Sequence, residues 1–229
     1  MNIYTKLYGK KNRRVIFLLA GWHTRIWMYT PFSIILSNNS FYCITYAYDD
    51  DVFSTNTEQT VENFKRIRDD VLRRIEKLKD DGYDDFSLFG TSLGSLLAIM
   101  IAHKSPDISK IILNTTTIDA ARTVWTWNHI KSYFKKDLIR QHFTLEKLEK
   151  VWESISPEHN INNLKDKQFL IYLSKKDQIM PYSLGNELTK DLEMYHYKYQ
   201  VIKNKYLGHG LTCYYNLVNS APYLKFLNS

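Results

Sequence analysis

The chain has 229 residues, of which 44% are hydrophobic and 24% are charged, a balance that excludes a disordered chain or a coiled coil. The formal net charge of +7 comes from basic residues spread along the chain, whereas nucleic-acid binding needs them clustered on one face among stacking aromatic residues. No run of about 18 apolar residues occurs, which argues against a membrane span. We therefore expect one globular domain over residues 1–229, with neither a nucleic acid nor a membrane span among its partners.

Runs of strand length recur along the chain. The first, Val15–Ala20, is continuously apolar and ends at Gly21, as expected of a strand buried on both faces. Other runs rich in aromatic, aliphatic and β-branched residues predict further strands. These are Phe41–Tyr48, Phe86–Phe89, Lys110–Asn114, Phe169–Ser174 and Tyr195–Ile202, with a weaker N-terminal pattern over Ile3–Tyr8.

Segments with helical spacing of apolar residues lie between these strands. They are Trp27–Leu36, Thr57–Lys79, Leu93–His103, Ser183–Leu192 and a closing helix over Cys213–Leu227. Strands that alternate with helices need crossover connections, which join parallel neighbours. The order predicts an α/β fold with a mainly parallel sheet of about six to seven strands and helices on both faces.

One long segment between two predicted strands has only helical pattern. Within residues 115–166, the helical pattern covers Val124–Phe134, Asp137–His142 and Leu145–Ser154, and Pro157 follows the last of these. An all-helical insertion of this size predicts a small lid over the strand ends, within the single domain.

Gly90-Thr91-Ser92-Leu93-Gly94 has the GxSxG pattern and falls between a predicted strand and a predicted helix. A nucleophilic serine needs a sharp turn that exposes its hydroxyl, and glycines two residues to either side let the backbones approach. The helix that begins after Ser92 adds the positive end of its dipole, which helps to stabilise an oxyanion. The context therefore predicts Ser92 as a nucleophile.

A serine nucleophile needs a base and a group that orients the base. His209 lies after the last predicted strand between two glycines, which add no bulky side chains to its loop. Asp177 follows the preceding strand, although an aspartate at such a position is also a common turn or helix-capping residue. Because parallel strands end at one edge of a sheet, the loops that carry Ser92, Asp177 and His209 are expected to converge there.

These motifs resemble the α/β-hydrolase superfamily from about Arg13 to Leu227. The order serine, aspartate, histidine is that of the superfamily, and Leu18-Leu19-Ala20-Gly21-Trp22 is similar to its strand ending in His-Gly, with Ala20 in place of the histidine. The resemblance implies that the backbone N–H groups of Trp22 and Leu93 form the oxyanion hole.

The chemistry implied is a serine hydrolase mechanism. Ser92 attacks an acyl carbonyl while His209 takes its proton, Asp177 orients the imidazole, and water then cleaves the acyl-enzyme. Neither a metal nor an organic cofactor is required for these steps.

The substrate is predicted less directly. Aromatic residues of the lid segment either pack it onto the sheet domain or line an apolar acyl pocket, and Trp125, Trp127 and Phe134 are the candidates for substrate contact. A small carboxylic ester is the first expectation. The alternative is a thioester on coenzyme A or on a carrier protein, which basic residues of the lid segment would attract. These residues are Arg122, Lys131, Lys135, Lys136 and Arg140.

A different class of function also stays open, a hydrolase-like binding protein that does not use its triad, because fold does not fix function. Location and assembly follow only from general features. The N-terminal residues lack a signal-peptide pattern, and Cys43 and Cys213 are too few for a disulfide framework, so the expected location is cytoplasmic. The sequence does not predict an oligomeric state.

Overall fold

A seven-stranded sheet forms the centre of the computed structural model, which describes residues 1–127 and 132–229. The strands lie in the order β1-β3-β2-β4-β5-β6-β7, and all neighbours are parallel except β1 and β3. Their bounds are β1 Ile3–Tyr8, β2 Arg14–Leu19, β3 Phe41–Tyr48, β4 Asp85–Thr91, β5 Ile108–Asn114, β6 Gln168–Ser174 and β7 Lys198–Asn204. The predicted class, α/β with a mainly parallel sheet of six to seven strands, is confirmed.

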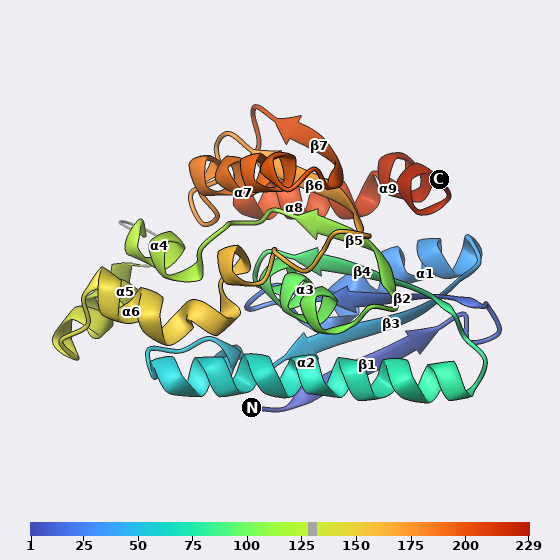
Figure 1. Ribbon diagram of the computed structural model, residues 1–229, viewed down its shortest axis with the longest axis horizontal. Coiled ribbons are helices and arrows are strands. Elements are labelled where there is room, and N and C mark those ends of the chain that lie inside the picture. The colour runs from blue at the N-terminus through green and yellow to red at the C-terminus, as the bar shows by residue number, and fades with distance from the viewer. Residues whose placement is uncertain (128–131) are drawn as a thin grey trace.

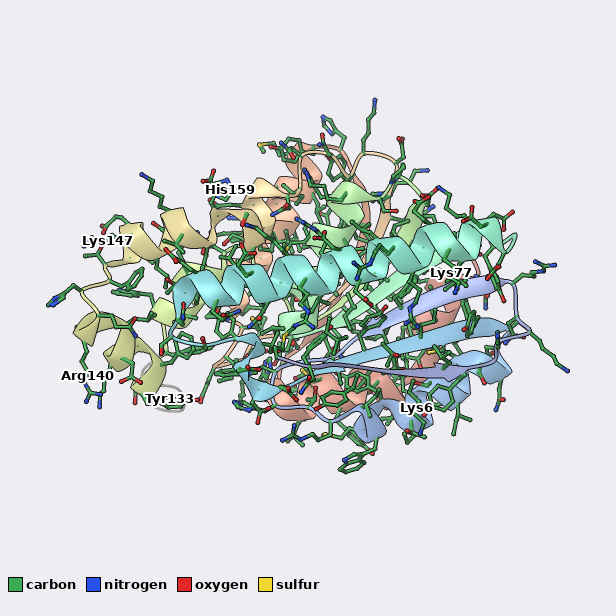
Figure 2. All side chains as sticks on the ribbon, turned by 90° about the horizontal axis from the view of Figure 1, so that it is seen from below. Lys6, Lys77, Tyr133, Arg140, Lys147 and His159 are labelled. Carbon is green, nitrogen blue, oxygen red and sulfur yellow. The ribbon has the colours of Figure 1, made fainter. Side chains whose placement is uncertain are left out.

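Helices cover both faces of this sheet (Figure 1). On one face α2 packs against α3, and on the other α1 and α9 meet over Phe89 of β4, where Phe32 and Tyr223 form edge-to-face contacts with its ring. The view in Figure 2 agrees, with α2 and α1 on opposite sides of the strands. The helix bounds are α1 Thr30–Asn38, α2 Thr57–Asp80, α3 Leu93–Lys104, α4 Ala120–Trp125, α5 Ser132–Arg140, α6 Leu145–Trp152, α7 Tyr182–Met194, α8 His209–Val218 and α9 Ser220–Leu227.

The central strands and α3 are apolar on every side, and the structure buries them completely. All residues of β2 from Val15 to Leu19 have no exposed surface, and the apolar residues of α3 from Leu93 to Ala102 are buried. This explains why their sequences read as continuous apolar runs, without the one-sided pattern of α2.

The segment between β5 and β6 is helical throughout its described residues and carries α4, α5 and α6. Figure 1 shows these three helices gathered at one end of the molecule, at the left, beyond the sheet. That this segment acts as a lid stays a prediction.

Some predicted element bounds are wrong. The helix expected over Val124–Phe134 is interrupted, since α4 ends at Trp125 and residues 126 and 127 are not helical. Residues 128–131 of that prediction lie outside the described residues. The strand expected from Tyr195 begins at Lys198, because α7 extends to Met194 and His196 takes a left-handed φ of 58°.

The predicted closing helix over Cys213–Leu227 is two helices. The first, α8, begins at His209, and the second, α9, begins at Ser220 after Asn219 with φ −79° and ψ 78°. Pro222 accounts for the break, because proline has no N–H to continue the hydrogen bonding of α8 and its ring would clash with the carbonyl of Val218.

Candidate active site

Ser92 occupies the sharp turn between β4 and α3. Its φ of 54° and ψ of −119° are strained for a residue with a side chain, and its N–H donates to the carbonyl of Asn114 at 2.9 Å. Only glycine can stand at positions 90 and 94. A Cβ at Gly90 would lie 2.2 Å from the Gly94 oxygen, and one at Gly94 would lie 2.1 Å from the Leu19 oxygen. The GxSxG pattern is therefore a packing requirement of the turn that exposes the serine.

His209 lies within hydrogen-bonding distance of both Ser92 and Asp177. Its Nδ1 lies 2.8 Å from Asp177 Oδ2 and 3.0 Å from Oδ1, and its Nε2 lies 2.9 Å from Ser92 Oγ. A carboxylate can only accept, so Nδ1 carries a proton and donates it to Asp177. In the neutral imidazole Nε2 then accepts from the Ser92 hydroxyl. The structure brings together the three side chains named from the sequence in the arrangement that nucleophilic attack requires.

Asp177 is fixed by the loop that follows β6. Besides His209, its Oδ1 accepts from the backbone N–H groups of Ile179 and Met180, at 2.9 and 2.8 Å. The residue is 8% exposed. The capping-type contacts noted as an alternative from the sequence are thus present together with the histidine contact, and they hold the carboxylate toward His209.

Asn114, at the end of β5, connects the nucleophile turn to the helix that carries His209. Its carbonyl accepts from Ser92 N, its Nδ2 donates to the Cys213 carbonyl at 2.9 Å, and its Oδ1 accepts from Asn216 Nδ2 at 2.8 Å. The side chain is completely buried. Sequence reasoning missed this residue, and the only signal for it was a polar residue ending a buried strand.

Two influences oppose each other at His209. Burial disfavours the charged imidazolium, but the hydrogen bond to Asp177, the contact with Cys213 and the charge of Asp177 outweigh it, so the pKa of His209 is raised above its ordinary value of 6.5. Cys213 lies one helical turn after His209 in α8, with its Sγ 3.9 Å from Nε2. The site therefore favours an imidazolium, the form that His209 takes after it accepts a proton from the serine.

The two residues whose backbone N–H groups are expected to bind an oxyanion, Trp22 and Leu93, line the same cavity as Ser92. Leu93 is the first residue of α3, so its N–H has no acceptor within the helix. Trp22 follows Gly21 at the end of β2, and its indole Nε1 donates to the Asp50 carbonyl at 2.7 Å, which fixes the ring. Both residues line the cavity described next. Their role as oxyanion donors stays a prediction.

A cavity of about 110 Å³, here called the inner cavity, opens beside Ser92. Its walls are mainly apolar, and among the described residues no lysine, arginine, aspartate or glutamate lines it. Its two threonines are already hydrogen-bonded, because Thr117 and Thr123 share a contact of 2.7 Å and Thr123 donates to the Asp119 carbonyl. The lining residues are Trp22, His23, Phe53, Ser92, Leu93, Leu96, Thr117, Ala120, Thr123, Val124, Trp127, Ile179, Met180 and His209.

Of the three aromatic residues expected to contact substrate, Trp127 lines the inner cavity. Its Nε1 donates to the Ile179 carbonyl at 3.0 Å, which holds the ring in the wall. Trp125 and Phe134 are not among the residues that line this cavity, and their expected contact with substrate stays a prediction. Phe134 packs behind the wall against the rings of Trp22 and Trp127, at 5.9 and 5.7 Å between centroids.

Trp125 contacts a cation instead. Lys135 Nζ lies 5.2 Å from the Trp125 ring centroid and donates to its carbonyl at 2.8 Å. Spacing alone could not distinguish the wall of the cavity from the layer behind it. The cavity is also lined by His23, Phe53 and Met180, which come from segments distant from the lid and which no sequence pattern indicated.

The basic residues proposed to attract a thioester carrier are partly engaged within the chain. Arg122 forms a two-point ion pair with Glu187 of α7, at 2.7 and 3.2 Å, and Arg140 pairs with Asp137 at 2.8 Å. Figure 2 shows Arg140 at the same outer end of the molecule as Tyr133 and Lys147. Lys131 lies outside the described residues. These pairings reduce the support for a carrier protein.

The described part of the chain contains no cluster of three or more histidine, cysteine, aspartate or glutamate side chains arranged to hold a metal ion. Over the same residues no helix is both long and apolar enough to cross a membrane.

Comparison with known proteins decides the family. Residues 63–228 match the prolyl oligopeptidase family, a stretch that includes Ser92, Asp177 and His209. The chain belongs to the prolyl oligopeptidase family. This places it among the serine hydrolases of the α/β-hydrolase superfamily, and the resemblance noted from the sequence is confirmed.

Solved structures share the fold of this prolyl oligopeptidase family member. The acylaminoacyl peptidase of Pyrococcus horikoshii superposes with a TM-score of 0.74 at 14% identity, over 99% of this chain and 38% of that one. An esterase from Exiguobacterium antarcticum gives 0.66 at 13% identity, covering 99% and 96% of the two chains. A monoacylglycerol lipase from Paleococcus ferrophilus gives 0.65 at 14%, covering 99% and 98%.

At these identities the likeness shows the fold alone. The chain spans 38% and 37% of the length of two acylaminoacyl peptidase chains that it resembles. A search of curated proteins found no match.

Proposed function

We propose that this chain hydrolyses a carboxylic ester with a small apolar acyl group, through an acyl-enzyme on Ser92. The observation that carries the proposal is the chain of hydrogen bonds from Ser92 through His209 to Asp177, situated at the wall of an apolar cavity.

The reaction follows from the geometry. Ser92 Oγ attacks the acyl carbon while His209 Nε2 takes its proton, and Asp177 stabilises the resulting imidazolium. The N–H groups of Trp22 and Leu93 bind the oxyanion, each contributing about 3 kcal/mol of transition-state stabilisation. His209 returns the proton to the leaving oxygen, and water then attacks the acyl-enzyme with His209 as base.

The size and chemistry of the inner cavity support the choice of acyl group. An apolar cavity of about 150 Å³ holds benzene, so about 110 Å³ accommodates an acyl chain of roughly four to six carbons. The threonines are already paired, and among the described residues the lining has no acidic or lysine or arginine side chain to bind a charged group. An uncharged aliphatic acyl group leaves no polar atom of this cavity newly buried without a partner.

Peptide-bond cleavage is the second candidate. The match to the prolyl oligopeptidase family favours it, and the same three side chains serve amide and ester hydrolysis. The inner cavity would then hold a small apolar amino-acid side chain. An acyl-thioester is a third substrate class, weakened by the ion pairs of Arg122 and Arg140.

A panel of substrates with one acyl group tests the proposal. Butanoyl groups are offered as a p-nitrophenyl ester, a coenzyme A thioester and a p-nitroanilide, with Ser92→Ala as the background control. We expect kcat/KM to be highest for the ester and the anilide to be cleaved no faster than by Ser92→Ala. Cleavage of the anilide above that background would assign the chain as a peptidase, and a higher value for the thioester than for the ester would assign it as a thioesterase.

The class of non-catalytic binding proteins is separated by the same panel. If purified, folded chain hydrolyses none of these compounds faster than Ser92→Ala does, the hydrolase proposal is wrong.

A further inference from the structure

A second hollow, distinct from the inner cavity, borders Ser92 and His209. This outer groove has a volume of about 530 Å³, within the range of small-molecule sites. It is lined by Gly21, Trp22, Thr24, Trp27, Met28, Tyr29, Pro31, Thr91, Ser92, His209, Gly210, Cys213, Tyr214 and Leu217.

Among the described residues, the outer groove and the inner cavity share Trp22, Ser92 and His209 and no others. An ester bound with its carbonyl at Ser92 therefore has two directions in which its two halves extend. One half enters the inner cavity, and the other lies in the outer groove.

His209 lines both hollows, and the side chain in contact with its Nε2 indicates which half goes where. The leaving oxygen takes its proton from Nε2, so the alcohol half must leave past that atom. Cys213, whose Sγ lies 3.9 Å from Nε2, lines the outer groove, as does Gly210 on the same helix. Leu93, the first residue of α3, lines the inner cavity and not the outer groove.

The outer groove is apolar and open to solvent. Trp27 of the short helix Ile26–Tyr29 is 69% exposed, and Tyr214 of α8 is 64% exposed. Among the described residues no lysine, arginine, aspartate or glutamate lines the groove. Exposed aromatic residues gathered around a hollow are characteristic of a binding surface for apolar groups.

We infer that the outer groove binds the alcohol half of the substrate, and that this half is an uncharged apolar group larger than the acyl half. The inference rests on the proposed ester hydrolysis and adds a substrate class to it, esters of a short acid with a long or bulky apolar alcohol.

Two ester series test it. In the first, acetates of primary alcohols from propyl to octyl vary the alcohol at nearly constant leaving-group basicity. In the second, p-nitrophenyl esters vary the acyl group from acetyl to decanoyl. We expect kcat/KM to rise about fourfold per methylene over the first few steps of the alcohol series. In the acyl series we expect a maximum near four to six carbons and a decline beyond it.

Variants locate the effect in the groove. Trp27→Ala removes an exposed wall and is expected to flatten the alcohol series while the acyl series keeps its maximum. Tyr214→Ala is a second variant with the same expectation. Met194→Ala is the matched control, because it removes an exposed side chain (62%) that lines neither hollow, and it should change neither series.

The outcomes separate the two proposals. If the esters are hydrolysed but the alcohol series is flat in the unmodified chain, or if Trp27→Ala alters the acyl series instead, the inference is overturned and ester hydrolysis stands. If no ester of either series is hydrolysed and a fluorophosphonate does not label Ser92, both fall together.

Discussion

Ser92 Oγ and His209 Nε2 lie 2.9 Å apart, although 117 positions separate the two residues in the chain. The contact depends on two supports that meet at the end of β5. The Ser92 N–H donates to the Asn114 backbone, and the Asn114 side chain holds α8, which begins at His209. The hydrogen bonds of Asn114 therefore help to set the distance between Ser92 Oγ and His209 Nε2.

Asn114→Ala tests this support. The change removes the hydrogen bonds to the Cys213 carbonyl and to Asn216 and leaves α8 free to shift, and a misplacement of about 1 Å costs up to about 100-fold in rate. We expect kcat for an ester to fall about 10- to 100-fold with little change in KM. Asn216→Ala is the matched control, because it keeps the bond from Asn114 Nδ2 to the Cys213 carbonyl. Equal effects of the two variants on kcat would contradict the assigned role of Asn114.

Asp177→Asn removes the negative charge that orients His209. An asparagine oxygen can still accept from the Ile179 and Met180 N–H groups, so the loop is expected to stay folded. The imidazole loses its carboxylate partner, and we expect kcat to fall by about 10⁴-fold. Steady-state kinetics on a p-nitrophenyl ester measures this, with the far-UV circular dichroism spectrum as the folding control. A loss below tenfold would mean that Asp177 does not serve His209 in catalysis.

The dependence of activity on pH follows from the raised pKa of His209. The histidine must be neutral to accept the serine proton, so kcat/KM increases as pH rises through its pKa. Because this pKa lies above the ordinary 6.5, the increase is expected on the alkaline side of that value. A profile that is already flat above pH 6.5 would contradict the assigned environment.

A substitution at Cys213 tests one of the causes that raise the pKa of His209. The contact of Cys213 with His209 raises the pKa of the histidine, so Cys213→Ala should move the rise in kcat/KM to lower pH. Cys43→Ala is the control, because Cys43 is buried in β3 between Ser33 and Thr45. The pH profile of Cys43→Ala should match that of the unmodified chain, and a shift of the same size in both variants would refute the effect of Cys213.

Replacing Gly94 or Gly210 by alanine is expected to have different effects on the free energy of folding. Gly94→Ala forces a Cβ to within 2.1 Å of the Leu19 carbonyl oxygen, a backbone atom that cannot move aside cheaply. We expect a loss of at least about 1–3 kcal/mol of folding free energy. Gly210→Ala meets no atom within 4 Å near the start of α8 and should be neutral or slightly stabilising. Urea denaturation of both variants measures the difference, and a stable Gly94→Ala chain would contradict the packing at the turn.

Much of the fold could be predicted from the sequence because the central elements have strong patterns. The continuous apolar runs of β2, β3 and β6 and the amphipathic stripe of α2 match their predicted positions closely. The patterns failed where local chemistry overrides periodicity. Pro222 breaks the predicted closing helix into two, and because His196 has a left-handed φ the last strand begins later than predicted.

The sequence predicted the three central side chains of the candidate site but not the residues that form the walls around them. Ser92, Asp177 and His209 each follow a strand of a parallel sheet, so topology brings them to one edge. The walls of the inner cavity come from side-chain packing between distant segments. No spacing rule distinguishes Trp127, in the wall, from Phe134, one layer behind it.

Labelling with a fluorophosphonate tests the central claim most directly, because the reagent reacts rapidly and stably with a serine that is activated by a histidine. Treated protein is digested and the modified peptide is identified by mass spectrometry, in the unmodified chain and in Ser92→Ala. We predict one modified residue, Ser92, and no labelling of the variant. Absence of labelling in the folded, unmodified chain, or equal labelling of Ser92→Ala, would contradict the proposal that this site is catalytic.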